Sequence, residues 1–133
     1  MRYLLDTNIW IFYLKNQDSA GGRRLRISAA AEIAVCSIVW AELLHGARKY
    51  ERRADRVARV ERTLSPFPSL PFDDNAAREY ALIRDQLETA GRSIGPNDLL
   101  IAAIARSHEL ILVSNNTEFG RVNGLTVEDW SIS

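Results

Sequence analysis

The stretch that decides the fold is MRYLLDTNIW (residues 1–10), in which one acidic residue separates two apolar segments. Residues 3–5 are apolar and predict a short buried strand, and residues 8–15 predict a helix that Asn8 can cap. Asp6 lies at the junction between the two. A carboxylate in this position either caps the helix or binds a ligand, and these residues alone leave both interpretations open.

The rest of the chain alternates short apolar strands with helices. Gly21-Gly22 predicts a break, and the prolines of SPFPSLPF (65–72) exclude a helix and favour an extended edge segment. Further strands are predicted over 33–36, 110–113 and 125–127, and helices over 24–31, 37–47 with Ser37 as cap, 51–63, 73–90 ending at Gly91, and 97–107. This alternation predicts an α/β fold: a three-layer domain with a mainly parallel sheet and helices on both faces.

Length and composition are ordinary for a globular protein. We expect the 133 residues to form a single domain, 1–133, because 47% are hydrophobic and 26% are charged. Cys36 is the only cysteine, so an intrachain disulfide is impossible. Asp6 interrupts any N-terminal apolar segment, and no later apolar run is long enough to cross a bilayer. We therefore expect a soluble cytoplasmic protein without a membrane partner.

Charge is segregated along the chain although the net charge is zero. Residues 48–62 contain seven basic and three acidic side chains, and Arg23, Arg24 and Arg26 form a second basic group. Such a segment either binds an anionic partner or is a solvated helix face with local ion pairs. The sequence leaves both possibilities open.

Acids and amides fall near the predicted carboxyl ends of several strands, where α/β sheets bind ligands. Each has an ordinary structural explanation: a helix cap, an exposed helix face, a favourable helix N-terminus, or a turn. The residues are Asp6, Glu42 in helix 37–47, Asp98 at the start of helix 97–107, and Asn115, Asn116 and Glu118 after strand 110–113.

Convergence of these carboxylates would require a cation. Carboxylates gathered at one point raise one another's pKa unless a positive charge neutralises them. Neither His45 nor His108 has a second His or Cys at metal-ligand spacing. An all-oxygen ligand set favours Mg²⁺ or Mn²⁺ over zinc.

With these residues assembled, the sequence resembles the PIN-domain family, and most closely the VapC toxins of bacterial VapBC toxin–antitoxin pairs. The resemblance covers nearly the whole chain, and the ordered set of motifs is more specific than any one of them. The matching stretches are YLLDTNIWIFYL (3–14), SIVWAELLHGA (37–47), IGPNDLLIAAIA (94–105) and LILVSNNTEFGRVNGLTVEDW (110–130).

The resemblance implies a PIN-like parallel sheet of four or five strands. It also implies an endoribonuclease that depends on Mg²⁺ or Mn²⁺, with Asp6, Glu42 and Asp98 as its acids. Asp6 and Asp98 would bind the metal directly, and Glu42 directly or through water. The family's fourth acid is replaced: Asn116 occupies the nearest equivalent position, and Glu118 is the only acid close by. Supporting roles are implied for Thr7, Asn8, Ser114 and Asn115, and RNA binding for Arg48, Lys49, Arg52, Arg53 and Arg56.

The resemblance also implies partners. These are a homodimer mate, a cognate VapB-like antitoxin that lies in the active-site groove and forms a hetero-oligomer with the toxin, and an RNA substrate such as tRNA, with initiator tRNA as a first hypothesis. Contacts to the antitoxin or dimer mate could come from Trp10, Phe12, Trp40 and Leu43, which could equally be core residues.

Two other functions compete with this one. The haloacid-dehalogenase-like phosphatases also place an Asp after the first strand, but they need a second Asp where this sequence has Asn8. A degenerate PIN-like module that binds RNA or protein without cleavage is favoured by Asn116, because it brings no charge to the fourth position.

Overall fold

The strands form one parallel sheet in the order β3-β2-β1-β4-β5. The structure is a computed structural model that describes residues 1–16 and 18–131. Its strands are β1 (Tyr3–Leu5), β2 (Ile33–Cys36), β3 (Ser69–Leu70), β4 (Ile111–Val113) and β5 (Val127–Glu128). Every residue of β1 and β2 is buried, as expected for parallel strands covered on both faces. The predicted fold class is confirmed.

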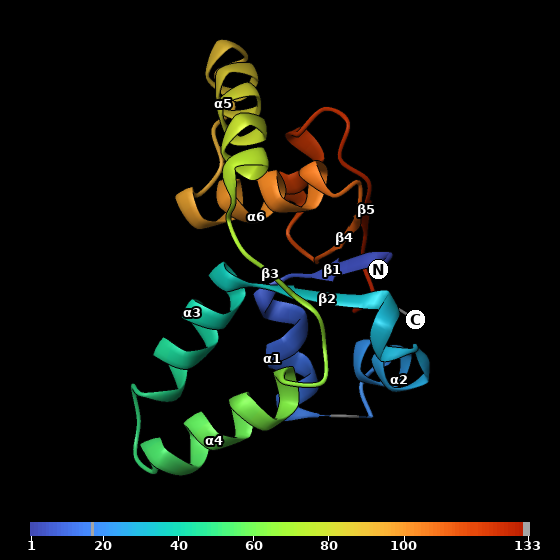
Figure 1. Ribbon diagram of the computed structural model, residues 1–133, viewed down its shortest axis with the longest axis vertical. Helices are drawn as coiled ribbons and strands as arrows, with labels where there is room; N and C mark the ends of the chain where they lie inside the picture. Colours follow the sequence, from blue (N-terminus) through green and yellow to red (C-terminus); the bar gives the residue numbers. More distant parts are fainter. Residues whose placement is uncertain (17, 132–133) are drawn as a thin grey trace.

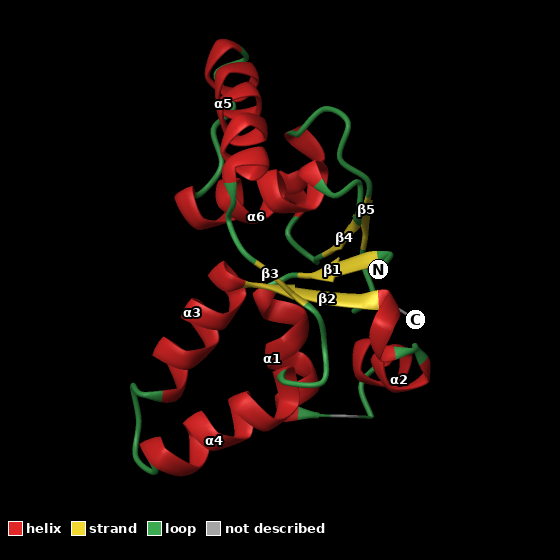
Figure 2. Ribbon diagram, viewed as in Figure 1, coloured by secondary structure: helices red, strands yellow, loops and turns green. Residues whose placement is uncertain are grey.

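Helices cover both faces of this sheet (Figures 1 and 2). One face carries α1 (Thr7–Lys15), α2 (Ala20–Ile27), α3 (Ser37–Ala47) and α4 (Arg53–Leu64), and the other carries α5 (Asp74–Thr89) and α6 (Pro96–Ser107). Short 3₁₀ helices follow α2 (η1, Ala30–Glu32) and β4 (η2, Thr117–Arg121). Residues 101–105 of α6 are all buried, which explains why that helix is apolar around its circumference.

The predicted break at Gly21-Gly22 is wrong, because both glycines lie inside α2. The Ser19 hydroxyl caps this helix by accepting a hydrogen bond from the Gly22 N–H. A Cβ atom at position 21 would lie 3.4 Å from the carbonyl oxygen of Trp130. The small residues therefore allow close packing of α2 against the C-terminal segment, and α2 ends at Ile27, earlier than predicted.

Two predicted helix caps are also wrong. The first helix begins one residue earlier than expected, at Thr7, so Asp6 is its N-cap and Asn8 lies inside it. The third begins at Ser37 itself, with Cys36 as N-cap and no side-chain cap. In both cases the strand passes into the helix with almost no intervening loop, which leaves no room for the cap that the sequence suggested.

The edge of the sheet and the core largely follow the prediction. The proline-rich segment forms the edge strand β3, and the preceding Pro68 carbonyl accepts a hydrogen bond from Val35 N–H. Trp10 is fully buried in the core and Leu43 is 5% exposed, which agrees with the core interpretation of these two residues, while Trp40 is partly buried. Phe12 is 38% exposed. Within residues 1–16 and 18–131, no helix has the length and apolar character needed to span a membrane.

Candidate active site

The candidate site lies where the carboxyl ends of the central strands meet. β1 pairs with β2 on one side and with β4 on the other, so the chain crosses over in opposite directions from β1. Asp6 follows β1 and Ser114 follows β4. This reversal of strand order is the place where open α/β sheets form their ligand crevice.

Asp6 caps α1, which is one of the two roles that its sequence position suggested. It is only 4% exposed, and its Oδ1 accepts a hydrogen bond of 2.7 Å from the Thr7 N–H at the start of α1. Its Oδ2 accepts a hydrogen bond of 2.8 Å from the Ser114 hydroxyl. The carboxylate thus caps the helix and is held by β4 at the same time.

Further hydrogen bonds extend from Asp6 in both directions. On one side the Thr7 hydroxyl donates to Glu42 Oε1 at 2.8 Å. On the other, Ser114 Oγ accepts from the Asn116 N–H at 3.0 Å, and the Asn116 side-chain amide donates to Asp98 Oδ2 at 3.1 Å. We call this set the acidic network: Asp6, Thr7, Glu42, Asp98, Ser114 and Asn116. It joins the three acids from three remote segments.

The acids repel one another at this point. The pKa of Asp98 is raised to about 6 by burial and, to a smaller extent, by the negative charges of Asp6, Glu42 and Glu118, while the Asn116 hydrogen bond opposes the shift. Burial also raises the pKa of Asp6, against the hydrogen bonds from Ser114 and Thr7. A cation bound here would relieve this repulsion.

The donors fit a hydrated divalent ion better than a fully enclosed one. In the described part of the chain, no three His, Cys, Asp or Glu side chains are arranged as a preformed metal cage. Both oxygens of Asp6 and one of Glu42 accept hydrogen bonds from protein donors. Mg²⁺ keeps several waters and needs only one or two carboxylates, so this oxygen-only set fits it without a cage.

The remaining predicted residues lie at different distances from the network. The Asn116 side chain accepts from the Glu118 N–H, so it caps η2 as well as contacting Asp98. Asn8 is exposed and Asn115 half-buried, and neither makes a side-chain hydrogen bond within the described residues. An exposed Asn8 gives no support to the phosphatase alternative.

Sequence reasoning missed Arg121. Its Nη1 donates to the Ser93 carbonyl at 3.0 Å and lies 3.5 Å from Glu118 Oε2. The guanidinium thereby ties the loop before α6 to η2, next to the acidic network. The only sequence signal was its position three residues after Glu118, a spacing that is common in unrelated helices.

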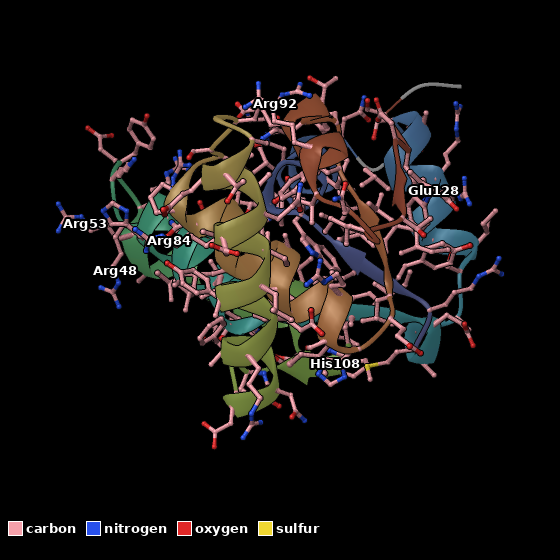
Figure 3. The ribbon with its side chains drawn as sticks, turned by 90° about the horizontal axis from the view of Figure 1, so that it is seen from above. Arg48, Arg53, Arg84, Arg92, His108 and Glu128 are labelled. Carbon is pink, nitrogen blue, oxygen red and sulfur yellow. The ribbon has the colours of Figure 1, made fainter. Side chains whose placement is uncertain are left out.

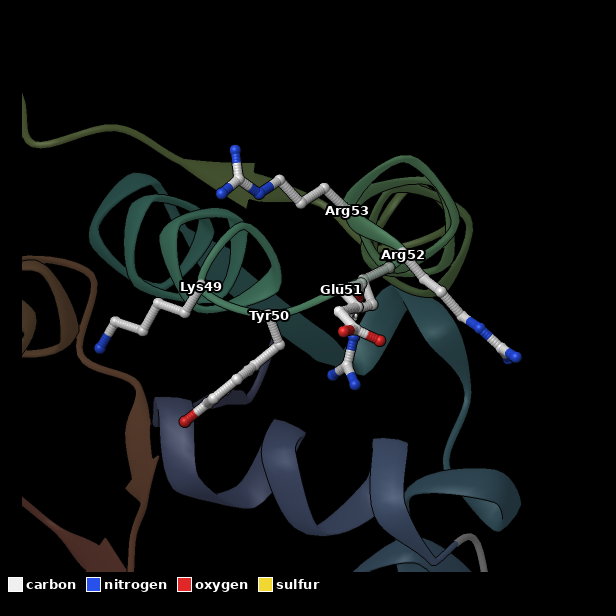
Figure 4. Close-up of a pocket in the computed structure, with 6 residues that line it drawn as sticks. Lys49, Tyr50, Glu51, Arg52 and Arg53 are labelled. Atoms are coloured by element: carbon white, nitrogen blue, oxygen red, sulfur yellow. Dashed lines mark hydrogen bonds between the residues drawn. The ribbon is translucent and has the colours of Figure 1, made fainter.

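The predicted RNA-binding residues gather on the turn between α3 and α4. We call residues 48–56 the basic turn. Arg48, Lys49, Arg52, Arg53 and Arg56 are all exposed, and all except Arg48 line an open notch of about 950 Å³ (Figure 4). Figure 3 shows Arg48 and Arg53 projecting outward at one edge of the molecule, with Glu128 at the opposite side.

A groove connects the basic turn with the acidic network. It has a volume of about 540 Å³ and lies between α1, α3 and α4. Glu42 lines it together with Lys49, Tyr50 and Arg56. Sequence reasoning had not singled out Tyr50, since one aromatic residue among charged neighbours carries little information.

Comparisons with known proteins agree with this geometry. Residues 3–125 match the PIN domain family. The chain is 39% identical over 132 residues to a tRNA(fMet)-specific endonuclease VapC of Shigella flexneri (98% of this chain, 99% of the relative), and 40% identical over 131 residues to Ribonuclease VapC2 of Haemophilus influenzae (98% of each). A DNA-bound VapBC crystal structure from Salmonella typhimurium superposes with a TM-score of 0.92 at 35% identity, covering 98% of both chains.

Proposed function

The chain belongs to the PIN-domain family, and from that premise we propose that it is a metal-dependent endoribonuclease, the toxin of a toxin–antitoxin pair. One observation carries the proposal: a continuous set of hydrogen bonds joins Asp6, Glu42 and Asp98, and the pKa of Asp98 is raised to about 6. Carboxylates joined in this way can bind one divalent cation, which neutralises their repulsion and can polarise a phosphate for hydrolysis.

The residues of the acidic network have distinct tasks in phosphodiester hydrolysis. Asp6 and Asp98 would hold a divalent ion, Mg²⁺ or Mn²⁺, with Glu42 as a direct or water-mediated ligand. Such an ion, when bound, makes water a better nucleophile and neutralises charge on the phosphate. Glu42 lines the groove and would take the proton of the attacking water.

Thr7, Ser114 and Asn116 act by positioning these acids. Thr7 and Ser114 hold both oxygens of Asp6, so its carboxylate has one orientation. Asn116 orients Asp98 without adding a negative charge. Glu118 is the nearest acid that could serve at the fourth position, and its charge already acts on Asp98.

The proposed substrate is tRNA, with initiator tRNA as the first candidate. The support is the name of the relative from Shigella flexneri, a tRNA(fMet)-specific endonuclease, together with the match over nearly the full length of both chains. The basic turn would bind the RNA backbone, because exposed cations near a nuclease site neutralise phosphates.

The proposed partners are a second copy of this chain and a VapB-like antitoxin. The support is the similarity to the VapBC complex of Salmonella typhimurium. An alternative is a PIN-like module that binds RNA without cutting it, and the neutral Asn116 is the observation in its favour.

A nuclease assay separates these functions. We expect the purified chain with Mn²⁺ to shorten initiator tRNA, EDTA to stop the reaction, and Asp98→Asn to reduce the rate by at least roughly 100-fold, because a ligand and a neighbouring charge are lost. Asp85→Asn, an exposed acid on α5, is the matched control and should cleave normally. RNA that is bound but never shortened would support the binding module, and a fully active Asp98→Asn would contradict the assigned site.

A further inference from the structure

The groove between α1, α3 and α4 is lined by side chains of different chemistry. Glu42 of the acidic network lines it together with Lys49 and Arg56 of the basic turn. Ile11, Leu43 and Val60 contribute to its apolar walls. A molecule that fills this groove must therefore combine flat apolar surface with negative charge.

Tyr50 is the aromatic side chain that lines the groove beside Lys49 and Arg56. It is 65% exposed, although the ring lines the groove, and Figure 4 shows it extending from the basic turn toward α1. The guanidinium carbon of Arg56 lies 5.6 Å from the centre of the Tyr50 ring. An exposed ring beside a cation is the arrangement with which proteins bind a base and its phosphate.

The turn that carries Tyr50 has a defined backbone conformation. Arg52 adopts a left-handed conformation (φ 61°) at the start of α4, which reverses the chain between the two helices. The Arg56 Nε donates a hydrogen bond of 3.0 Å to the Glu51 carbonyl oxygen. Ring and guanidinium thus belong to one locally braced turn.

We propose that the groove is a subsite for a nucleotide that flanks the scissile bond, with its base stacked on Tyr50 and its phosphate bound by Lys49 and Arg56. The inference rests on the proposed nuclease function and deepens it. Because stacking on an aromatic ring tolerates every base, this contact selects unpaired RNA rather than a particular sequence. The enzyme would then prefer substrates whose cut site lies in a loop.

Charge complementarity supports RNA as an occupant of the groove. The basic side chains that line it are Lys15, Lys49, Arg56 and Arg59, against the single acid Glu42. Each nucleotide brings one phosphate to these cations and one flat base to the apolar walls.

Binding of two single-stranded probes tests the proposal. The probes are a ten-residue oligoadenylate and an abasic ribose-phosphate chain of the same length, measured by fluorescence anisotropy with Mg²⁺ and with Asp98→Asn in every protein to prevent cleavage. We expect roughly tenfold tighter binding of oligoadenylate, a preference that Tyr50→Ala abolishes and Tyr50→Phe retains. Lys49→Ala should weaken both probes equally, and Leu82→Ala, an exposed apolar residue on α5, should change neither.

The outcomes decide between occupants. If Tyr50→Ala keeps the preference for oligoadenylate, the stacking subsite is wrong. It is also wrong if the Tyr50 substitution weakens only the binding of a purified antitoxin and leaves RNA unaffected, since the groove is then a protein-docking site. A chain that binds RNA with the expected preference but never cleaves any RNA with Mn²⁺ would contradict the nuclease function instead, so the two failures are distinguishable.

Discussion

The acidic network and the basic turn differ in burial and in how firmly their side chains are held. The network is built on the ends of buried strands, and Asp6 and Ser114 within it are 4% and 2% exposed. The basic turn lies between two helices on the surface, and Lys49 and Arg53 make no ion pair within the described residues. Its charges are free to follow a flexible partner, whereas those of the network are fixed.

This difference reflects what each task requires. Catalytic groups must be held within about half an ångström of their working positions, which demands rigid elements and satisfied hydrogen bonds. Any nearby cation attracts a phosphate, so several exposed basic side chains can each contribute part of the RNA affinity. Substitutions in the network should therefore have large and mutually dependent effects, while substitutions in the turn should have small and additive ones.

The largest effect that tests this contrast is expected for Ser114→Ala. The change removes a donor from Asp6 Oδ2 and an acceptor from the Asn116 N–H, both at a buried position. Because residues that orient metal ligands are worth roughly 10- to 100-fold, we expect a loss of that size in Mn²⁺ affinity and in cleavage rate. Titration of Mn²⁺ into the protein, followed by cleavage assays, measures both.

A matched control for this change is Ser107→Ala in α6. The Ser107 hydroxyl donates to the Ile104 carbonyl within its own helix and has no link to the acids. It should bind Mn²⁺ normally. Equal losses from the two substitutions would mean that Ser114 contributes only to general stability, and the idea of a precisely held network would fail.

A smaller effect, with a defined pH dependence, is expected for the stability of Asp98→Asn without metal. The folded protein raises the pKa of Asp98 from 3.8 to about 6, so the protonated form is favoured by folding. The corresponding stability is fully present below pH 3.8 and is lost as the pH rises through 6. Asn stays neutral, so the variant should gain about 1–2 kcal/mol relative to wild type between pH 4 and pH 8, a figure that allows for solvent screening of this half-buried group.

Urea unfolding in EDTA at several pH values measures this gain. Asp85→Asn is again the control, because that exposed carboxyl lies on the far face of the sheet from α1–α4. A gain that is independent of pH would show that the folded protein does not raise the pKa of Asp98. Addition of Mn²⁺ should make the wild type more stable to urea than Asp98→Asn, because only the wild type is then stabilised by binding the ion.

The sequence predicted the network better than its details. Asp6, Glu42 and Asp98 could be placed together because parallel strands bring their carboxyl ends to one edge, whatever the exact helix bounds. The Ser114 hydrogen bond to Asp6 and the helical glycines of α2 could not, because they depend on tertiary contacts between residues more than 100 positions apart. Tyr50 was missed for the opposite reason: nothing local distinguishes a groove residue from any exposed tyrosine.

The smallest effects are expected in the basic turn. Lys49→Ala, Arg53→Ala and Arg56→Ala should each weaken RNA binding roughly two- to fivefold, additively, because each removes one phosphate contact of several. Each should also lower the slope of log affinity against log salt by about 0.7, the value for a single-stranded phosphate contact. Arg78→Ala is the control: this exposed arginine on α5 bonds to Asn75 on the other face of the sheet and should change neither quantity. If one of the three substitutions alone abolished binding, the turn would be a specific site rather than a diffuse one, and the contrast with the acidic network would no longer hold.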